Sequence, residues 1–259
     1  MGAKAFARYL YSSVPGLALA RFALKDVAAV YSSKPEFAGL KLLGIEGGLI
    51  VDIGANRGQS VAAFRRLAPL SRIFAFEPEP RSAARLLSRY QDDAMVTVHA
   101  CALAEQSKAM TLFIPTYGRW NCDGMAALDR REATEWLHNP GRMLWFNPNK
   151  LAVAEHIIEC RTLDSLKLSP RLIKLHAQGA EFSILKGAEH TIRSHRPALM
   201  CAFPQMETTE LLAGWGYAPH IYLDRRFKPG VAPPDTTFTW YLADEHRRHL
   251  PRNTHPPAS

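Results

Sequence analysis

Apolar and polar positions follow two alternating periods between Leu49 and Ala243. Short apolar runs typical of buried strands alternate with segments in which apolar residues recur every three or four positions, as on one face of a helix. Strands that alternate with helices indicate an α/β fold, with a mostly parallel sheet and helices on both faces. The predicted strands are LIVDIG, RIFAFEP, MVTVHACA, MTLFIP, HIIECR, LIKLHA, PALMCAF, YAPHIYL and TFTWYLA, and the predicted helices are SVAAFRRLA, PRSAARLLSRY and the residues near 180–193 and 208–213.

The first 48 residues predict a helical extension ahead of this domain. We expect its apolar stripe to pack against the α/β domain. The alternative is a basic amphipathic helix that rests on a membrane surface. The stripe repeats at spacings of three, four or seven, with a break near Pro15-Gly16, and consists of Phe6, Leu10, Val14, Leu17, Leu24, Val27 and Tyr31.

Length and composition fit one ordinary α/β domain. The chain has 259 residues, of which 47% are hydrophobic and 22% are charged, enough to bury a substantial core. We expect three parts: the helical extension 1–48, the α/β domain 49–245 with a lid-like insertion at 115–150, and a flexible basic tail 246–259.

Charge, cysteine usage and apolar runs bear on the partners, metal sites and cellular location to be expected. The net charge of +8 favours acidic partners, but part of it lies in the predicted tail, so it says little about the substrate. The four cysteines form no CxxC pair, which argues against a structural zinc ion, and we predict no metal site. No apolar run approaches the ~18 residues that span a bilayer, and no secretory pattern is visible. We therefore expect a cytoplasmic protein that can also lie at the membrane periphery.

The stretch LIVDIGANRGQS, residues 49–60, places an acid at the end of the first strand and two glycines in the turn that follows. Ligands of doubly wound sheets bind at this carboxyl edge, and Gly54 and Gly58 let the backbone approach a ligand closely. Asp52 ends the strand, and Glu77 ends the next strand about 20 residues after Gly58, a distance at which an acid reaches ribose hydroxyls. The pattern predicts a nucleoside site; an α/β turn that binds no nucleoside is the alternative.

The identity of the nucleoside follows from the loop. An NAD site needs three glycines around the pyrophosphate, whereas the loop G-A-N-R-G has two. S-adenosylmethionine has no phosphate, and its ammonium and sulfonium groups suit an acid such as Asp52. We therefore predict S-adenosylmethionine as the cofactor, with an NAD-dependent oxidoreductase as the weakest alternative.

Several motifs, in this order, resemble the FkbM-type S-adenosylmethionine-dependent methyltransferases. The resemblance extends over about residues 49–203 and implies a class I methyltransferase fold, a Rossmann-like, mostly parallel seven-stranded sheet with helices on both faces. It also implies O-methylation of a hydroxyl on a sugar or on a glycosylated or other secondary-metabolite small molecule. The motifs are LIVDIGANRGQS, FAFEPEP, HACALAE, RTLDSL and, most extensively, LIKLHAQGAEFSILKGAEHTIRSHRPAL.

The resemblance also assigns a cofactor site at three strand ends. It implies that the methionine end of the cofactor is lined by the first loop, the ribose by the end of the second strand, and the adenine by the third. DGMAAL, residues 123–128, resembles a small-residue motif beside the active site. The implied residues are Asp52, Gly54, Ala55, Asn56 and Gly58 for the methionine end, Glu77 and Pro78 for the ribose, and Cys101 and Ala102 for the adenine.

Two positions depart from the family pattern. Where relatives carry Lys-Ile-Asp, this chain has Lys174-Leu175-His176, and Phe203 stands where a glutamate is usual. We expect His176 to be the general base for the acceptor hydroxyl, supported by Lys174 or Glu181, because an ordinary histidine pKa of ~6.5 suits proton exchange near neutral pH. The alternatives are a hydrogen-bonded wall residue, and a cofactor-binding protein of the same fold whose catalysis has been altered.

The sequence says least about the acceptor of the methyl group. The irregular segment 116–149 holds Trp120, Trp136 and Trp145. Flat aromatic faces suit sugar rings, so we expect a sugar or glycoconjugate acceptor, although each single tryptophan is better explained as core of the insertion. A nucleic-acid methyltransferase is disfavoured because the chain lacks the pattern used on flipped-out bases, so we expect no nucleic-acid partner. Peripheral membrane contact and a homo-oligomer stay open.

Overall fold

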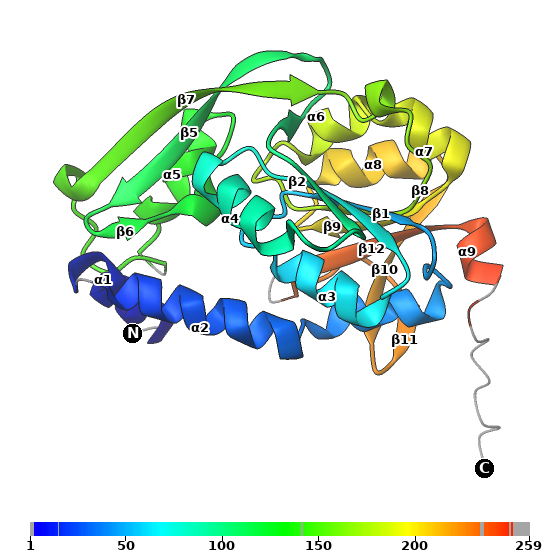
Figure 1. Ribbon diagram of the computed structural model, residues 1–259, viewed down its shortest axis with the longest axis horizontal. Helices are drawn as coiled ribbons and strands as arrows, with labels where there is room; N and C mark the ends of the chain where they lie inside the picture. Colours follow the sequence, from blue (N-terminus) through cyan, green and yellow to red (C-terminus); the bar gives the residue numbers. More distant parts are fainter. Residues whose placement is uncertain (1–2, 15, 141, 234–235, 249, 251–259) are drawn as a thin grey trace.

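The computed structural model describes residues 3–14, 16–140, 142–233, 236–248 and 250, and the larger of its two sheets has eight strands in the order β11-β10-β12-β9-β8-β1-β2-β3 (Figure 1). The five strands from β9 to β3 run parallel, and β12 lies antiparallel between β9 and β10. The mostly parallel sheet expected of a class I methyltransferase is confirmed. The strands are β1 (Leu49–Ile53), β2 (Arg72–Phe76), β3 (Val96–His99), β8 (Pro170–Leu175), β9 (Ala198–Ala202), β10 (Tyr217–Leu223), β11 (Arg226–Pro229) and β12 (Phe238–Ala243).

The predicted count of seven strands is wrong, because an edge hairpin adds an eighth. After β10 the chain turns through Asp224 and Arg225, which both have positive φ, and returns as β11 antiparallel to β10. Two consecutive non-glycine residues in the left-handed region are uncommon. The apolar pattern therefore did not reveal this turn.

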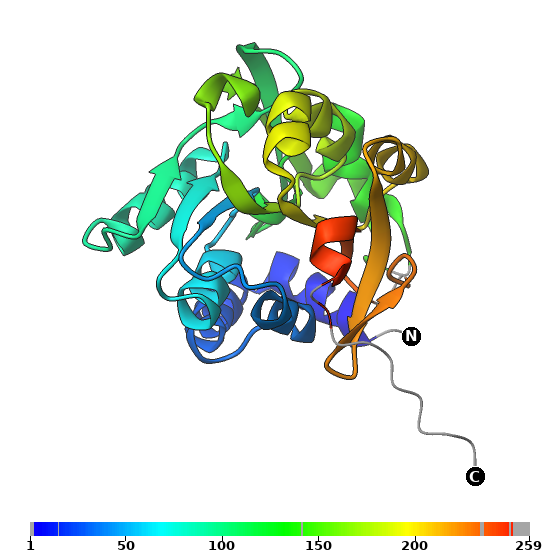
Figure 2. The same cartoon turned by 90° about the vertical axis from the view of Figure 1, so that its right-hand side faces the viewer.

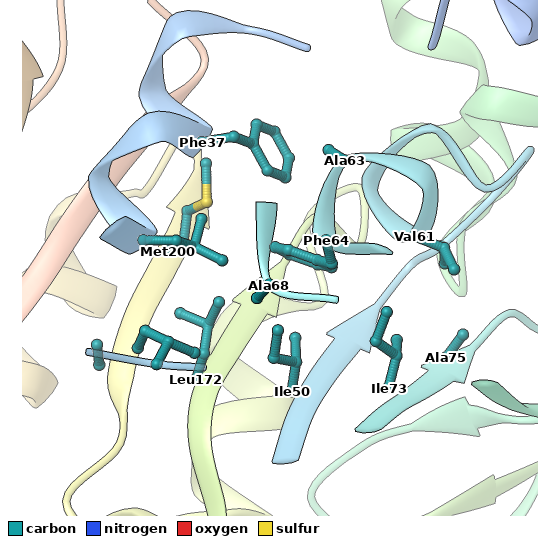
Figure 3. Packing of buried hydrophobic residues seen from close by; sticks show 14 of the residues in the cluster. Phe37, Ile50, Val61, Ala63, Phe64, Ala68, Ile73, Ala75, Leu172 and Met200 are labelled. Carbon is teal, nitrogen blue, oxygen red and sulfur yellow. The ribbon is translucent and has the colours of Figure 1, made fainter. Parts of the chain in front are cut away.

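Helices cover both faces of the sheet (Figure 2). Side chains of β1 serve the two faces in turn: Ile50 joins one core, which includes Phe64 of α3 (Figure 3), while Val51 and Ile53 join the other. This alternation produces two apolar layers, one on each side of the strands. The first face carries η1 (Pro35–Leu42), α3 (Gln59–Leu67) and α4 (Pro80–Tyr90), and the second carries α6 (Glu181–Lys186), α7 (Glu189–His195) and α8 (Met206–Gly214).

The helix predicted over 180–193 is two helices, α6 and α7, separated at Gly187. A Cβ added at Gly187 would lie 2.1 Å from the carbonyl oxygen of Ala104. The Gly187 carbonyl in turn accepts a hydrogen bond from the backbone N–H of Asp164, at the start of η4 (Asp164–Leu166). The close approach of these segments requires glycine here and interrupts the helix.

The insertion is more regular than predicted, because it belongs to a second sheet of order β4-β7-β5-β6. β5 and β7 pair antiparallel along the whole of β5, and Asp129 caps α5 by accepting hydrogen bonds from two backbone N–H groups. The segment 116–149, expected to be irregular, thus holds a helix and a short strand around their own apolar cluster. The elements are β4 (Ala102–Leu103), β5 (Lys108–Tyr117), β6 (Trp120–Asn121), η2 (Asp123–Met125), α5 (Arg130–His138), η3 (Pro148–Lys150) and β7 (Leu151–Arg161).

The extension forms α1 (Ala3–Ser13) and α2 (Leu17–Tyr31), which lie along one edge of the molecule (Figure 1). The expectation that its apolar stripe packs against the domain is wrong for most of its members. Leu24 is 72% exposed, Val27 59% and Tyr31 79%.

Polar contacts explain which face of α2 turns inward. The Arg57 guanidinium binds the Asp26 carboxylate with a nitrogen–oxygen distance of 2.6 Å. Arg66 donates hydrogen bonds to the backbone carbonyls of Ala29 and Val30, near the last turn of α2. These contacts hold the polar face of α2 against α3 and leave the apolar stripe outward.

The remaining expectations concern the C-terminal tail, membrane-spanning helices and the cysteines. The predicted flexible tail 246–259 starts inside α9 (Asp244–Arg248), and residues 249 and 251–259 lie outside the described residues. Among the described helices, none is both long enough and apolar enough to cross a membrane. All four cysteines are buried, and none of them forms a disulfide with another described residue.

Candidate active site

A cavity of about 630 Å³ opens at the carboxyl ends of β1, β2 and β8. This is the edge of the sheet at which the sequence predicted a ligand, and the volume lies within the range of small-molecule sites. One wall consists of strand ends, and the facing wall consists of α1, α2, α5 and strands β5 and β6 of the second sheet. The strand-end wall is made of residues 53–57, 76–78, 101–103, 174 and 176–178.

Gly54 begins the loop after β1 and lines the cavity. Its φ is +72°, and a Cβ at this position would lie 2.0 Å from the carbonyl oxygen of His176. The backbone N–H groups of Gly54 and Ala55 both donate to the Phe76 carbonyl, at 3.0 and 3.1 Å. The loop is thus clamped between the ends of β2 and β8, which only glycine permits.

Glu77 holds the same loop through its carboxylate. Oε2 accepts a hydrogen bond of 2.6 Å from the Asn56 N–H, and Oε1 accepts one of 2.8 Å from the Glu79 N–H. Burial raises the pKa of Glu77 to about 7, although these two N–H groups oppose the shift. Each oxygen can still accept one further hydrogen bond from a ligand.

Asn56, which also lines the cavity, has φ of +46°. Its side-chain Oδ1 is buried and accepts no hydrogen bond from any residue that the structure describes. A buried acceptor without a partner is costly unless a ligand or water supplies the donor.

Asp52 lies behind the loop and is not part of the cavity wall, contrary to the role that the resemblance implied. Its fully buried carboxylate binds the Lys174 Nζ at 2.9 Å and accepts a hydrogen bond of 2.5 Å from the Ser60 hydroxyl. Lys174 Nζ also donates to the carbonyls of Ile53 and Gly54, at 3.1 and 2.8 Å. The Asp52–Lys174 pair therefore ties β1 to β8 and positions the loop.

Gly58 also shapes the loop from outside the cavity. It begins α3 with φ of +81°, and a Cβ there would lie 2.7 Å from Leu86 Cδ2. The implied contact of Gly58 with the cofactor is therefore replaced by a packing role between α3 and α4.

The other predicted cofactor residues do line the cavity: Ala55, Pro78, Cys101 and Ala102. Burial raises the pKa of the Cys101 thiol to about 11, which keeps it neutral. Together with Phe76, these groups form an apolar wall beside Glu77. Beyond the cavity wall, the His99 ring stacks on Phe76 with ring centroids 4.6 Å apart.

The three predicted catalytic residues do not lie together in the cavity wall. His176 lines the cavity, but Glu181 does not, because its carboxylate accepts hydrogen bonds from the backbone N–H groups of Ala177 (2.6 Å) and Gly179 (2.9 Å). Lys174 lines the cavity but pairs with Asp52, not with Glu181. The expected support of His176 by Glu181 is therefore absent among the contacts of the described residues.

His176 differs from an ordinary histidine. Its ring lies near Phe203 and Phe238, with centroid distances of 6.1 and 6.0 Å. Burial, followed by the charges of Lys174 and Lys34, lowers its pKa to about 3. The ordinary value of ~6.5 assumed from the sequence does not hold in this environment. The imidazole is neutral at physiological pH and can accept a hydrogen bond.

The facing wall was missed in the sequence. It contains Arg8, Arg21 and Lys25 from α1 and α2, together with Trp120 from β6 and Trp136 from α5. The available signal was the position of these cations on α1 and α2 away from the apolar stripe. The apolar stripe indicates only that the segment is helical, and nothing local indicates what the opposite face of the helices contacts.

The tryptophans of the insertion have different surroundings. Trp120 is buried in the cluster of the second sheet, as expected for core. Trp136 packs against that cluster, with Arg8 and Arg142 over its ring at 4.5 and 5.2 Å. Trp145 is exposed, so the core interpretation is wrong for it. No group of three or more potential metal-ligating side chains occurs in the described part of the chain.

Comparisons with known proteins agree on the class of protein. The family described as Methyltransferase FkbM domain matches residues 52–228, more than half of the chain. A 2-O-methyltransferase of Sinorhizobium fredii, NoeI, is 26% identical over 160 residues, which are 57% of this chain and 60% of that protein's length. The solved methyltransferase FkbM of Methylobacillus flagellatus KT is 21% identical; the match covers 91% of this chain and 56% of that one, with a TM-score of 0.49.

Proposed function

The chain belongs to the FkbM methyltransferase family, and from that premise we propose that it transfers a methyl group to a hydroxyl of a sugar or glycoconjugate. It is a methyltransferase, and S-adenosylmethionine is its methyl donor. The observation that carries the proposal is one continuous cavity in which a carboxylate at the end of β2 and a neutral imidazole after β8 both take part.

The residues of the strand-end wall fit the donor. Glu77 retains acceptor capacity for two ribose hydroxyls, and the apolar groups around Cys101 and Ala102 suit an adenine ring. The buried, unpartnered Asn56 Oδ1 can accept a hydrogen bond from the ammonium of the methionine portion. Asp52 and Lys174 support this wall by fixing the loop, not by contact with the donor.

His176 is the group we assign to the acceptor hydroxyl. When bound, the donor supplies an electrophilic methyl group on a sulfonium, which leaves as a neutral thioether. The main requirement is then alignment of the attacking oxygen at ~3–3.5 Å. The neutral imidazole of His176 accepts a hydrogen bond from the hydroxyl and orients its oxygen. Because its pKa is about 3, it retains a proton poorly and passes the hydroxyl proton on to solvent.

A sugar acceptor is supported by two features. The relative NoeI is named a 2-O-methyltransferase, which favours oxygen as the methylated atom. The facing wall combines the aromatic rings of Trp120 and Trp136 with charged side chains, a composition that suits a polar ring.

The test is a transfer assay that measures S-adenosylhomocysteine release with a panel of mono- and oligosaccharides, alongside calorimetry with S-adenosylhomocysteine alone. We expect binding of the product cofactor and acceptor-dependent release. Binding without release for any hydroxyl acceptor would refute sugar O-methylation and favour altered catalysis. Absence of binding would refute the site assignment itself.

A further inference from the structure

The facing wall of the cavity concentrates positive charge. Arg8 of α1 and Arg21 and Lys25 of α2 all line the cavity. Glu77 is the one carboxylate among the described lining residues, and its oxygens already hold the loop. The wall thus presents cations to a space that offers them no counter-ion.

The contacts of these cations do not neutralise them. Arg8 donates to the backbone carbonyl of Arg142 and lies over the Trp136 ring, and Arg21 lies over the Tyr11 ring at 4.6 Å. None of Arg8, Arg21 and Lys25 forms an ion pair with a described residue.

The acid that acts on Lys25 is committed elsewhere. Asp26, next to Lys25 in the chain, forms its ion pair with Arg57. Burial, followed by repulsion from Arg21 and other nearby cations, lowers the pKa of Arg8 and of Lys25. Holding like charges together in this way is unfavourable unless an anion binds between them.

A second group on the same wall lacks a partner. Trp120 lines the cavity and is 6% exposed, and its indole Nε1 is buried without a hydrogen-bond acceptor among the described residues. An indole N–H can only donate. Its natural complement is an acceptor oxygen on a ligand.

We propose that Arg8, Arg21, Lys25 and the Trp120 N–H form a subsite for an oxyanion on the acceptor, so that the substrate is an acidic, phosphorylated or sulfated carbohydrate. This inference rests on the proposed sugar O-methylation. The donor also carries a carboxylate, but one carboxylate cannot compensate three cations. The acceptor must therefore supply further negative charge.

The experiment uses the full chain saturated with S-adenosylhomocysteine, so that the carboxylate of the product cofactor is already in place. Calorimetry then measures binding of inorganic phosphate, glucose, glucose 6-phosphate and glucuronate. We expect the anions to bind at least about tenfold more tightly than glucose, since a charge-assisted hydrogen bond is worth one factor of ten or more. The two sugar anions show whether a phosphate or a carboxylate is preferred.

The variant R21Q/K25Q, itself saturated with S-adenosylhomocysteine, should lose this preference. Lys41→Gln, which removes an exposed charge outside the cavity, is the matched control and should keep the preference. If the double variant does not fold, the single variants R21Q and K25Q test the same point. Equal binding of glucose and the anions, or a preference that survives R21Q/K25Q, would overturn the subsite; loss of S-adenosylhomocysteine binding by wild type would instead overturn the donor site.

A different observation carries a second inference, about the outer face of α2. Leu19, Leu24, Val27, Val30 and Tyr31 are all exposed and share one side of the helix. Alanines fill the positions between them. The charged residues of α2 point elsewhere, since Arg21 and Lys25 line the cavity and Asp26 binds Arg57.

We infer that this face docks on a lipid bilayer with anionic headgroups. A continuous exposed apolar face on one side of a helix is the pattern of interfacial helices, and the net charge of +8 complements an anionic surface.

Flotation with phosphatidylcholine vesicles, with and without phosphatidylglycerol, tests this inference. We expect binding to the anionic vesicles that is lost in L24Q/Y31Q and retained in the control V231Q, which alters an exposed apolar residue away from α2. No vesicle binding by wild type, or self-association that L24Q/Y31Q abolishes, would contradict it. Neither result depends on the identity of the acceptor.

Discussion

Replacement of Glu77 by glutamine should change how cofactor affinity depends on pH. The wild-type carboxylate is 5% exposed, and its pKa is about 7 because of burial. Ribose hydroxyls donate hydrogen bonds, so they bind the ionised carboxylate better than the protonated one. Cofactor binding therefore lowers the pKa, and affinity must rise with pH until the carboxylate of the free protein is ionised.

The magnitude follows from the raised pKa. If only the ionised form binds, the dissociation constant of S-adenosylhomocysteine at pH 6 is about tenfold above its limiting value, and above pH 8 it is nearly constant. Glu77→Gln removes this dependence. It should also weaken binding by about 1.5–3 kcal/mol, the worth of a charge-assisted hydrogen bond.

The assay is isothermal titration of S-adenosylhomocysteine from pH 6 to pH 8. Glu181→Gln is the matched control, because Glu181 also accepts hydrogen bonds from two backbone N–H groups after a strand but lies outside the cavity wall. The control should retain the wild-type pH dependence. A Glu77→Gln variant with the wild-type curve, or a wild-type affinity that falls as pH rises, would refute the reasoning.

The pH dependence of the free energy of unfolding tests the raised pKa of Glu77 independently. The folded pKa of about 7 lies above the ordinary value of 4.5, so the native state keeps a proton that the unfolded chain has lost. The contribution of Glu77 to stability is therefore fully present below pH 4.5 and is lost as pH rises through 7. The difference corresponds to about 3 kcal/mol. Urea unfolding across this range should show a smaller decline with pH in Glu77→Gln than in wild type.

Three further predictions concern the loop and the imidazole. His176→Ala should lower kcat by about 10²-fold without weakening S-adenosylhomocysteine binding. The wild-type kcat should show no histidine titration near pH 6.5, because the His176 pKa is about 3. A change of kcat with pH near 6.5 that His176→Ala abolishes would contradict this. Gly54→Ala should destabilise the protein by more than the ~1–2 kcal/mol of a left-handed residue, because the new Cβ would meet a backbone oxygen. Gly58→Ala should stay within that range, because its Cβ would meet the flexible end of a side chain. Equal unfolding midpoints of the two variants would argue against the clamped loop. Lys174→Met should lower the free energy of unfolding by about 3–5 kcal/mol, because Asp52 is left buried and unpaired. Adding Asp52→Leu should restore much of this free energy. If urea unfolding shows that the losses of the two single variants add up in the double variant, the pair is not coupled.

Local sequence determined the framework of the strand-end wall of the cavity. The alternation of strands and helices gave the parallel sheet, because each period reflects which side of an element is buried. Gly54 and Glu77 were found from their spacing, since the end of one strand and the end of its neighbour necessarily meet at one edge. The edge hairpin and the break at Gly187 were not found, because each depends on a backbone turn or on contact with a distant segment.

Tertiary structure alone decided the partners of each charge. Asp52 is an acid beside a loop in the sequence, but the register of β1 against β8 brings Lys174 to it and takes it out of the cavity. His176 is an ordinary imidazole until burial and the neighbouring lysines depress its pKa. The stripe on α2 predicts a helix, but which side of that helix faces the domain depended on Arg57 and on residues far away in the chain. Periodicity depends on neighbours three or four residues apart, whereas ionisation and docking depend on charges that only the folded chain brings together.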